Sequence, residues 1–164
     1  MVLDSNVVCM IHTYNLEIRW EGSSKESTSS YTSYTRNHSI KSENKPLVLG
    51  SSDPHFMGDK SRYNPEELFL SSISSCHMLW YLHLCSDNQI IVTSYIDNPV
   101  GHMKTDADGG GSFIKVVLNP TITITGEYML EIARNLHDDA HRLCFIANSC
   151  NFPISCEPQF IKQG

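Results

Sequence analysis

Apolar and polar positions alternate near the start of the chain, and this two-residue period predicts a half-buried β-strand over residues 12–20. Tyr31, Tyr34 and β-branched threonines favour a second strand near residues 30–36, paired with the first as a hairpin; a mobile loop is the alternative. Residues 47–63 follow Pro46, contain Gly50, Pro54 and Gly58, and predict a long loop.

The clearest element is a helix that starts after Asn64. Asn64 is a suitable N-cap, Pro65 occupies the first helical position, and Glu67 can close a capping box. Apolar residues then continue almost without interruption over residues 68–84. Because a helix that is apolar on most sides is a buried one, we expect a central helix, covered all round, that ends near Asp87.

Strands and a second helix are predicted after the first helix. Three strand-like runs follow, at residues 90–96, 100–104 and 113–124. Asp108 and the glycines after it predict a hairpin turn between the last two runs. Residues 128–143 carry an apolar stripe with helical spacing, and Phe160 and Ile161 favour a short final strand. The order of the elements predicts the α+β fold class with mainly antiparallel sheet.

Composition narrows the function classes. A chain of 164 residues with 40% hydrophobic and 18% charged residues predicts a single globular domain over residues 1–164. The net charge of -6 argues against nucleic acid or an anionic membrane as a partner, because such binders are basic. No apolar run reaches the ~18 residues that span a bilayer, and the first 13 residues lack a signal-peptide pattern. We therefore expect a cytoplasmic protein.

Six cysteines are present, and in a reducing cytoplasm they do not predict a disulfide framework. Cys76 lies in the middle of the first helix, where a buried core thiol is the ordinary interpretation. Cys144 follows the second helix; a new helical turn starting there would favour its thiolate. Two thiols on neighbouring helices are a candidate redox pair. The other four are interpreted as structural or incidental thiols: Cys9, Cys85, Cys150 and Cys156. Cys150 is close to Cys144 in sequence and could replace it as the partner of Cys76.

Metal-binding patterns are also present, but they are incomplete. His137 and His141 stand at positions i and i+4, as in H-E-x-x-H, but Asp occupies the position of the catalytic Glu and no third ligand is evident. A second set of soft ligands consists of Cys76, His77, His83 and Cys85. Cys76 and His83 share a helix face, but Cys85 is turned away from them. We therefore expect no metal and no cofactor, and keep a zinc-binding hydrolase as the third hypothesis.

Two motifs resemble those of a known family. The segment Asn64–Leu70 (NPEELFL) is followed by Ser-Ser-Cys-His at residues 74–77, and Ala140–Cys144 reads AHRLC. In this order and at this separation, they resemble the OsmC/Ohr family of osmotically inducible and organic hydroperoxide resistance proteins. The residues after each cysteine look like a YhfA-like branch.

The resemblance implies a fold and a set of site residues. The fold would be OsmC-like, with two central helices packed with small antiparallel β-sheets in an intertwined homodimer. By resemblance, Cys76 is the peroxidatic thiol, Cys144 the resolving thiol, and Glu66 the active-site glutamate. The family also uses an arginine; its usual position in one branch holds a methionine here, so Arg36 and Arg62 are the candidates.

The resemblance also implies an activity. We expect a thiol-dependent peroxidase that reduces alkyl or fatty-acid hydroperoxides to alcohols through a Cys76 sulfenic acid and a Cys76–Cys144 disulfide. A dithiol reductant, with a lipoylated protein as the candidate, would reset the enzyme. The alternative is a non-peroxidase redox sensor or small-ligand binding protein that retained the cysteines.

One geometric expectation is independent of the family. Glu66 and Cys76 are ten residues apart, which is ~15 Å along a straight helix. Glu66 therefore cannot easily serve the Cys76 of its own chain. Either the helix bends, an arginine bridges the gap, or Glu66 acts on the site of a partner chain.

Overall fold

The computed structural model describes residues 10–22, 27–125 and 129–162. The chain separates into two compact units, residues 1–65 and residues 66–164. The single-domain organisation expected from the sequence stays a prediction.

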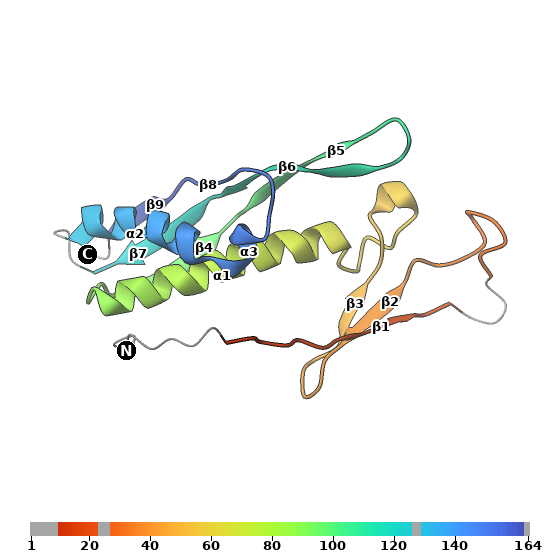
Figure 1. Ribbon diagram of the computed structural model, residues 1–164, viewed down its shortest axis with the longest axis horizontal. Helices are drawn as coiled ribbons and strands as arrows, with labels where there is room; N and C mark the ends of the chain where they lie inside the picture. Colours follow the sequence, from red (N-terminus) through yellow and green to blue (C-terminus); the bar gives the residue numbers. More distant parts are fainter. Residues whose placement is uncertain (1–9, 23–26, 126–128, 163–164) are drawn as a thin grey trace. The chain divides into compact units, whose positions relative to one another are not determined.

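The first unit contains a small antiparallel sheet of three strands (Figure 1). In chain order they are β1 (Glu17–Trp20), β2 (His38–Lys41) and β3 (Val48–Gly50), and a short 3-10 helix, η1 (Pro54–Phe56), follows. The predicted strand at residues 12–20 is confirmed only over its last four residues. The predicted strand at residues 30–36 is wrong, since that segment forms turns. Its hydroxyl groups bond locally instead: Ser33 Oγ donates to the carbonyl of Ser30 at 2.9 Å.

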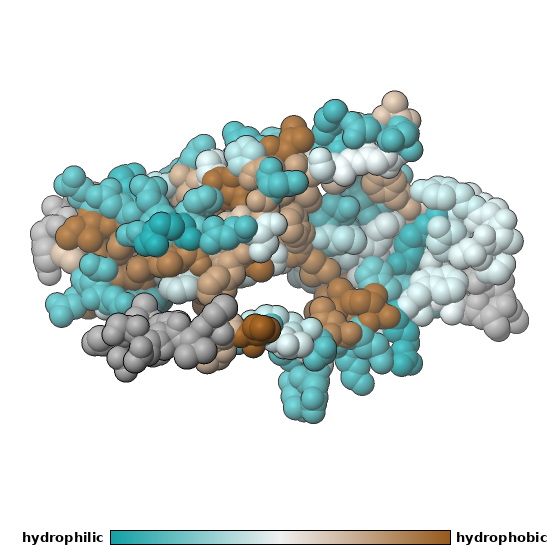
Figure 2. All heavy atoms as spheres, viewed as in Figure 1, coloured by the Kyte–Doolittle hydropathy of each residue, from teal (hydrophilic) through white to brown (hydrophobic). Residues whose placement is uncertain are grey.

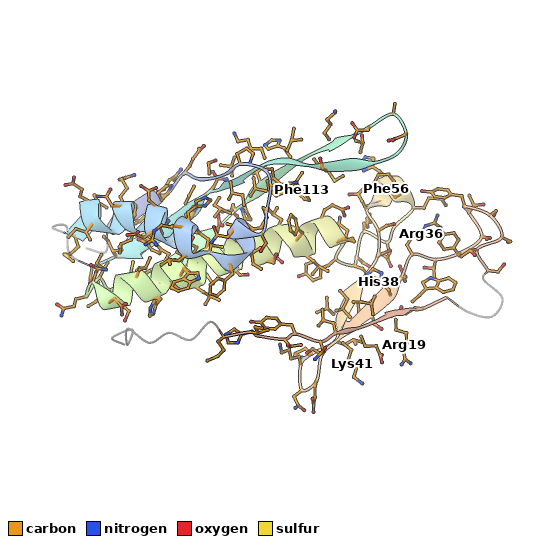
Figure 3. The ribbon with its side chains drawn as sticks, viewed as in Figure 1. Arg19, Arg36, His38, Lys41, Phe56 and Phe113 are labelled. Carbon is orange, nitrogen blue, oxygen red and sulfur yellow. The ribbon has the colours of Figure 1, made fainter. Side chains whose placement is uncertain are left out.

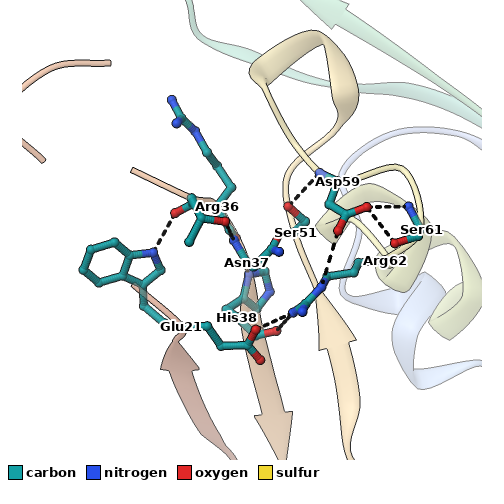
Figure 4. A network of polar contacts seen from close by, with 10 residues as sticks. Glu21, Arg36, Asn37, His38, Ser51, Asp59, Ser61 and Arg62 are labelled. Atoms are coloured by element: carbon teal, nitrogen blue, oxygen red, sulfur yellow. Dashed lines mark hydrogen bonds and ion pairs between the residues drawn. The ribbon is translucent and has the colours of Figure 1, made fainter. Parts of the chain in front are cut away.

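A polar network connects the segments of the first unit (Figure 4). The Arg62 guanidinium donates to the Glu21 carboxylate at 2.7 Å and lies 3.7 Å from the Asp59 carboxylate. The backbone of β3 continues this connection, because Tyr63 N donates to Leu49 O at 3.2 Å. The segment expected to be a long loop therefore contributes a strand and several fixed turns.

The second unit combines helices with two three-stranded sheets (Figure 1). The helices are α1 (Pro65–Asp87), α2 (Leu130–Leu143) and α3 (Phe145–Asn148). The strands are β4 (Val92–Asp97), β5 (Val100–Thr105), β6 (Gly111–Leu118), β7 (Pro120–Ile124), β8 (Ile154–Cys156) and β9 (Gln159–Lys162). The β5–β6 hairpin was expected. The single strand expected over residues 113–124 is divided into β6 and β7, and β7 pairs antiparallel with β4. Strands β8 and β9 join β6 and β7 in parallel. The α+β class is confirmed.

Helix α1 has the bounds that its capping residues predict. Its buried side chains follow a four-residue spacing on one face: Ile73, His77, Tyr81 and Cys85. Other faces are open within this chain, where Leu79 is 63% exposed and hydrophobic residues reach the surface of the unit (Figure 2). The expectation of a helix covered all round is therefore not met by the single chain.

Helix α2 packs on the same core as α1. Ala133, Leu136 and Ala140 are buried in a cluster with Tyr81 and β7 residues. His137 is buried beside them, whereas Ile132, expected on the apolar stripe, is 43% exposed. In the part of the chain that the structure describes, no helix is both long and apolar enough to cross a membrane.

Candidate active site

The structure brings the thiols of Cys76 and Cys144 into contact. Cys76 is half-buried in the middle of α1, and Cys144 is fully buried as the N-cap of α3. A side-chain hydrogen bond joins the two thiols across 68 positions of sequence. Both are free cysteines in this structure. This arrangement makes the two thiols a candidate redox pair.

The environment of Cys144 corrects one expectation. Its Sγ accepts a hydrogen bond from Ala147 N at 3.4 Å, as expected of a thiol at the start of a helix. Burial nevertheless raises the pKa of Cys144 to about 11; the hydrogen bond with Cys76 raises it too, and the backbone N–H of Ala147 lowers it by less than either. The prediction of a favoured Cys144 thiolate is wrong, because α3 has only four residues and the site is buried. Cys144 is a neutral thiol at neutral pH.

An apolar pocket lies on the Cys76 face of α1. It has a volume of about 270 Å³ and is lined by Leu79, Trp80 and His83. These residues follow Cys76 at three, four and seven positions, so they share its side of the helix. Phe145, next to Cys144, meets the Trp80 ring edge-on with centroids 5.7 Å apart. The thiol pair thus has an aromatic and aliphatic surface beside it.

Glu66 lies at the start of α1, in its first turn. Its Oε2 atom is buried and has no hydrogen-bond partner among the residues that the structure describes. Because α1 is one continuous α-helix over 23 residues, no break brings this carboxylate back to Cys76 of the same helix. A bridging arginine and action on a partner chain remain as explanations.

The two candidate arginines belong to the first unit and have different surroundings. The Arg36 guanidinium packs on the Tyr31 and Tyr34 rings, at 4.5 and 4.0 Å from their centroids, and donates to the carbonyls of both tyrosines (Figure 3). Arg62 is paired with the carboxylates of Glu21 and Asp59 (Figure 4). Which arginine serves the thiolate stays a prediction.

Sequence reasoning missed a buried polar cluster between α1 and α2. His77 Nε2 lies 3.0 Å from His137 Nδ1, and Cys156 Sγ lies 3.5 Å from the same nitrogen. Burial lowers the pKa of His77 to about 4 and that of His137 to about 3, so both are neutral at neutral pH. His141, the expected partner of His137, is exposed. The sequence did contain a signal for the burial of His137, since this residue follows Ala133 by four positions on the buried stripe of α2.

Comparison with known proteins identifies the family. The sequence pattern of OsmC-like proteins matches residues 58–159, which is well over half of the chain. The chain belongs to the OsmC-like family. A comparison with curated proteins found no match. The YhfA-like branch stays a prediction.

Solved structures support the same conclusion. An OsmC-like protein of unknown function from Vibrio cholerae is 30% identical, with a TM-score of 0.82 over 90% of this chain and 99% of that one. An organic hydroperoxide resistance protein from Elizabethkingia anophelis is 18% identical, with a TM-score of 0.62 over 94% and 100% of the two chains. One from Legionella pneumophila is 15% identical, with a TM-score of 0.60 over 92% and 98%. The last two share the fold.

Proposed function

We propose that the protein is a thiol-dependent peroxidase that reduces organic hydroperoxides to alcohols. The observation that carries this proposal is the contact between the Cys76 and Cys144 thiols, one on α1 and the other at the start of α3. Membership of the OsmC-like family supports it, because structural relatives are named organic hydroperoxide resistance proteins. Cys76 is the half-buried thiol of the pair, and Cys144 is fully enclosed.

The first step is nucleophilic attack by Cys76. Its thiolate attacks the distal oxygen of the hydroperoxide, an S–O bond forms, and the O–O bond breaks. The leaving alkoxide takes a proton and departs as the alcohol, while Cys76 becomes a sulfenic acid. An arginine held by Glu66 would stabilise the charge that develops on the peroxide oxygens.

The second step closes the disulfide. Cys144 attacks the sulfenic sulfur of Cys76, the S–O bond breaks, and the proton of the Cys144 thiol leaves with the departing hydroxide as water. The raised pKa of Cys144 fits this role, because a protonated thiol does not compete for the peroxide. An external dithiol then reduces the disulfide by thiol exchange and is itself oxidised to a disulfide; a lipoylated protein has this chemistry.

The surface beside the thiol pair suits an alkyl substrate. Leu79 and Trp80 present apolar surface on the Cys76 side of α1, and the Phe145 ring adjoins it. An alkyl or fatty-acid chain would bury apolar area there, whereas hydrogen peroxide has none to bury. We therefore propose organic hydroperoxides, rather than hydrogen peroxide, as the preferred substrates.

Intact-mass analysis after one equivalent of cumene hydroperoxide tests the proposal. We expect a rapid loss of two hydrogens per chain, with peptide mapping that places the new disulfide between Cys76 and Cys144. In the Cys144→Ser variant, the same treatment should instead add oxygen to Cys76. The matched control is Cys150→Ser, which removes a half-buried thiol close in sequence and should still lose two hydrogens.

The outcomes separate the proposed peroxidase from the alternative functions. A disulfide that forms within seconds and returns to the dithiol with dihydrolipoamide, over repeated additions of peroxide, supports the peroxidase. Slow oxidation without turnover would indicate the redox sensor or ligand-binding protein. An unchanged mass, or a Cys76 that carries three oxygens in the wild-type protein, would overturn the proposal.

We further propose that Glu66 serves the Cys76 of a second copy of this chain in a homodimer. The buried, unpartnered Oε2 atom of Glu66 and the unbroken helix between the two residues support this assignment. Mixing the Glu66→Gln and Cys76→Ser variants tests it, because a mixed dimer would contain one site with both functional residues. We expect each variant alone to be impaired and the mixture, after unfolding and refolding together, to regain activity.

The control for this experiment is a mixture of Cys76→Ser with Cys144→Ser. The resolving thiol lies in the same chain as Cys76, so this mixed dimer contains no complete thiol pair and should stay inactive. If the first mixture is no more active than its separate components, although size-exclusion chromatography shows dimers, Glu66 acts within its own chain or not at all.

A further inference from the structure

We propose that His77, His137 and Cys156 form a binding site for one zinc ion per chain, separate from the thiol pair. The three side chains come from α1, α2 and β8, and one potential ligand atom of each lies within 4.8 Å of the other two. His77 is 1% exposed and His137 is 4% exposed, so both imidazoles are enclosed. Imidazole and thiolate are the ligands that zinc prefers in proteins.

Two of the three separations between ligand atoms are close to those of a zinc site. Bond lengths of ~2.0–2.1 Å to nitrogen and ~2.3 Å to sulfur place tetrahedral ligands roughly 3.3 Å apart for two nitrogens and roughly 3.5 Å apart for nitrogen and sulfur. The corresponding separations here are 3.0 Å between His77 and His137 and 3.5 Å between His137 and Cys156. The ring centroids of the two histidines are 5.3 Å apart, against roughly 5.2 Å for imidazoles on one tetrahedral ion.

Zinc uptake needs a small rearrangement. The two imidazole rings are parallel within 6° and meet edge to edge through one hydrogen bond. Each ring must turn so that its lone pair points at the ion instead of at the other ring. The Cys156 thiol gives up its proton as the Zn–S bond forms, so uptake of one Zn²⁺ releases one H⁺ from this residue.

Charge and access favour a cation at this position. The carboxylates of Asp97, Asp138 and Glu157 are near enough to Cys156 to interact with its charge. Arg134 is a cation near His137 that opposes them in part. A pocket of about 630 Å³ reaches both His137 and Cys156 and provides a path for the ion. Three protein ligands next to an open pocket leave the fourth position for water.

The site should be exchangeable rather than permanently filled. The outer nitrogens, His77 Nδ1 and His137 Nε2, are buried and have no hydrogen-bond partner among residues 10–22, 27–125 and 129–162. Outer-shell partners of ligating histidines are worth ~10–100-fold in metal affinity. We therefore expect zinc to bind more weakly than in a closed structural site and to be removed by a chelator without unfolding.

Cobalt substitution and metal analysis test the site on the full chain. The apo protein, titrated with Co²⁺, should show a thiolate-to-cobalt charge-transfer band that saturates at one equivalent and is displaced by Zn²⁺. The Cys156→Ser variant should lose this band. Cys150→Ser, another half-buried thiol, should retain it, and so should the Cys76→Ser/Cys144→Ser double variant. Retention in the double variant separates this site from the proposed peroxidase chemistry.

A measurement on the wild-type protein covers the case in which Cys156→Ser does not fold. Zinc should slow alkylation of Cys156 at least tenfold, as measured by peptide mass, while alkylation of Cys150 stays unchanged. Failure to retain zinc after dialysis against micromolar metal would overturn the proposal. Loss of the cobalt band from the Cys76→Ser/Cys144→Ser variant would overturn it as well, because the ion would then belong to the redox thiols.

Discussion

Replacement of Cys76 by serine is expected to abolish hydroperoxide turnover. The proposed reaction begins with attack of the Cys76 sulfur on the peroxide, and a serine hydroxyl is protonated at neutral pH and far less nucleophilic. Removal of a covalent nucleophile lowers turnover by roughly 10³-fold or more. Consumption of tert-butyl hydroperoxide in the presence of dihydrolipoamide, followed by a peroxide dye assay, measures the effect.

The Cys144→Ser variant separates the two thiol roles in the same assay. It should carry out the first turnover at the wild-type rate and then lose activity, because the Cys76 sulfenic acid has no resolving thiol and oxidises further. Cys150→Ser serves as the control and should keep the wild-type steady rate. Turnover by Cys76→Ser above one tenth of the wild-type rate, in a protein with unchanged circular dichroism, would contradict the assigned mechanism.

The elements that were predicted correctly are those determined by residues close together in the sequence. Asn64 and Pro65 define the start of α1, and the Asp108 turn defines the β5–β6 hairpin. The strand expected at residues 30–36 did not form because the hydroxyls of Ser33 and Thr35 bond to nearby backbone groups. The parallel pairing of β8 with β6 and of β9 with β7 depends on contacts between distant segments, which periodicity does not contain.

In the candidate site too, local motifs were predictable, whereas features that depend on contacts between distant segments were not. Resemblance to the OsmC/Ohr motifs selected Cys76 and Cys144, and the structure places their thiols in contact. The charge state of Cys144 was not predictable, because burial opposes the helix N-terminus and burial follows from packing. The pairing of His77 with His137 spans 60 positions and requires α1 and α2 to be packed together. The spacing within α2 alone indicated His141, rather than His77, as the partner of His137.

The buried histidine pair should make the protein strongly sensitive to acid. The folded-state pKa values of His77 and His137, about 4 and about 3, lie below the ordinary value of 6.5 because burial disfavours the charged imidazole. The contribution of the two neutral histidines to the stability of the fold is therefore fully present above pH 6.5. It is lost as the pH falls from 6.5 towards 3, since the unfolded chain takes up protons that the folded chain excludes. The shift in the pKa of His77 alone corresponds to roughly 3 kcal/mol in the free energy of unfolding.

Urea unfolding between pH 7 and pH 4.5, with a chelator present so that no metal contributes, measures this loss. Asp53 and Asp59 have pKa values below the ordinary 3.8, so their titration lies below this range. We expect the free energy of unfolding to fall by up to ~2.7 kcal/mol per pH unit where both histidines titrate in the unfolded state. His102→Gln removes an exposed side chain outside this cluster and should keep this slope, whereas His137→Gln should reduce it by about half. A wild-type stability that is flat over this pH range would show that the pair is protonated or solvated in the folded protein.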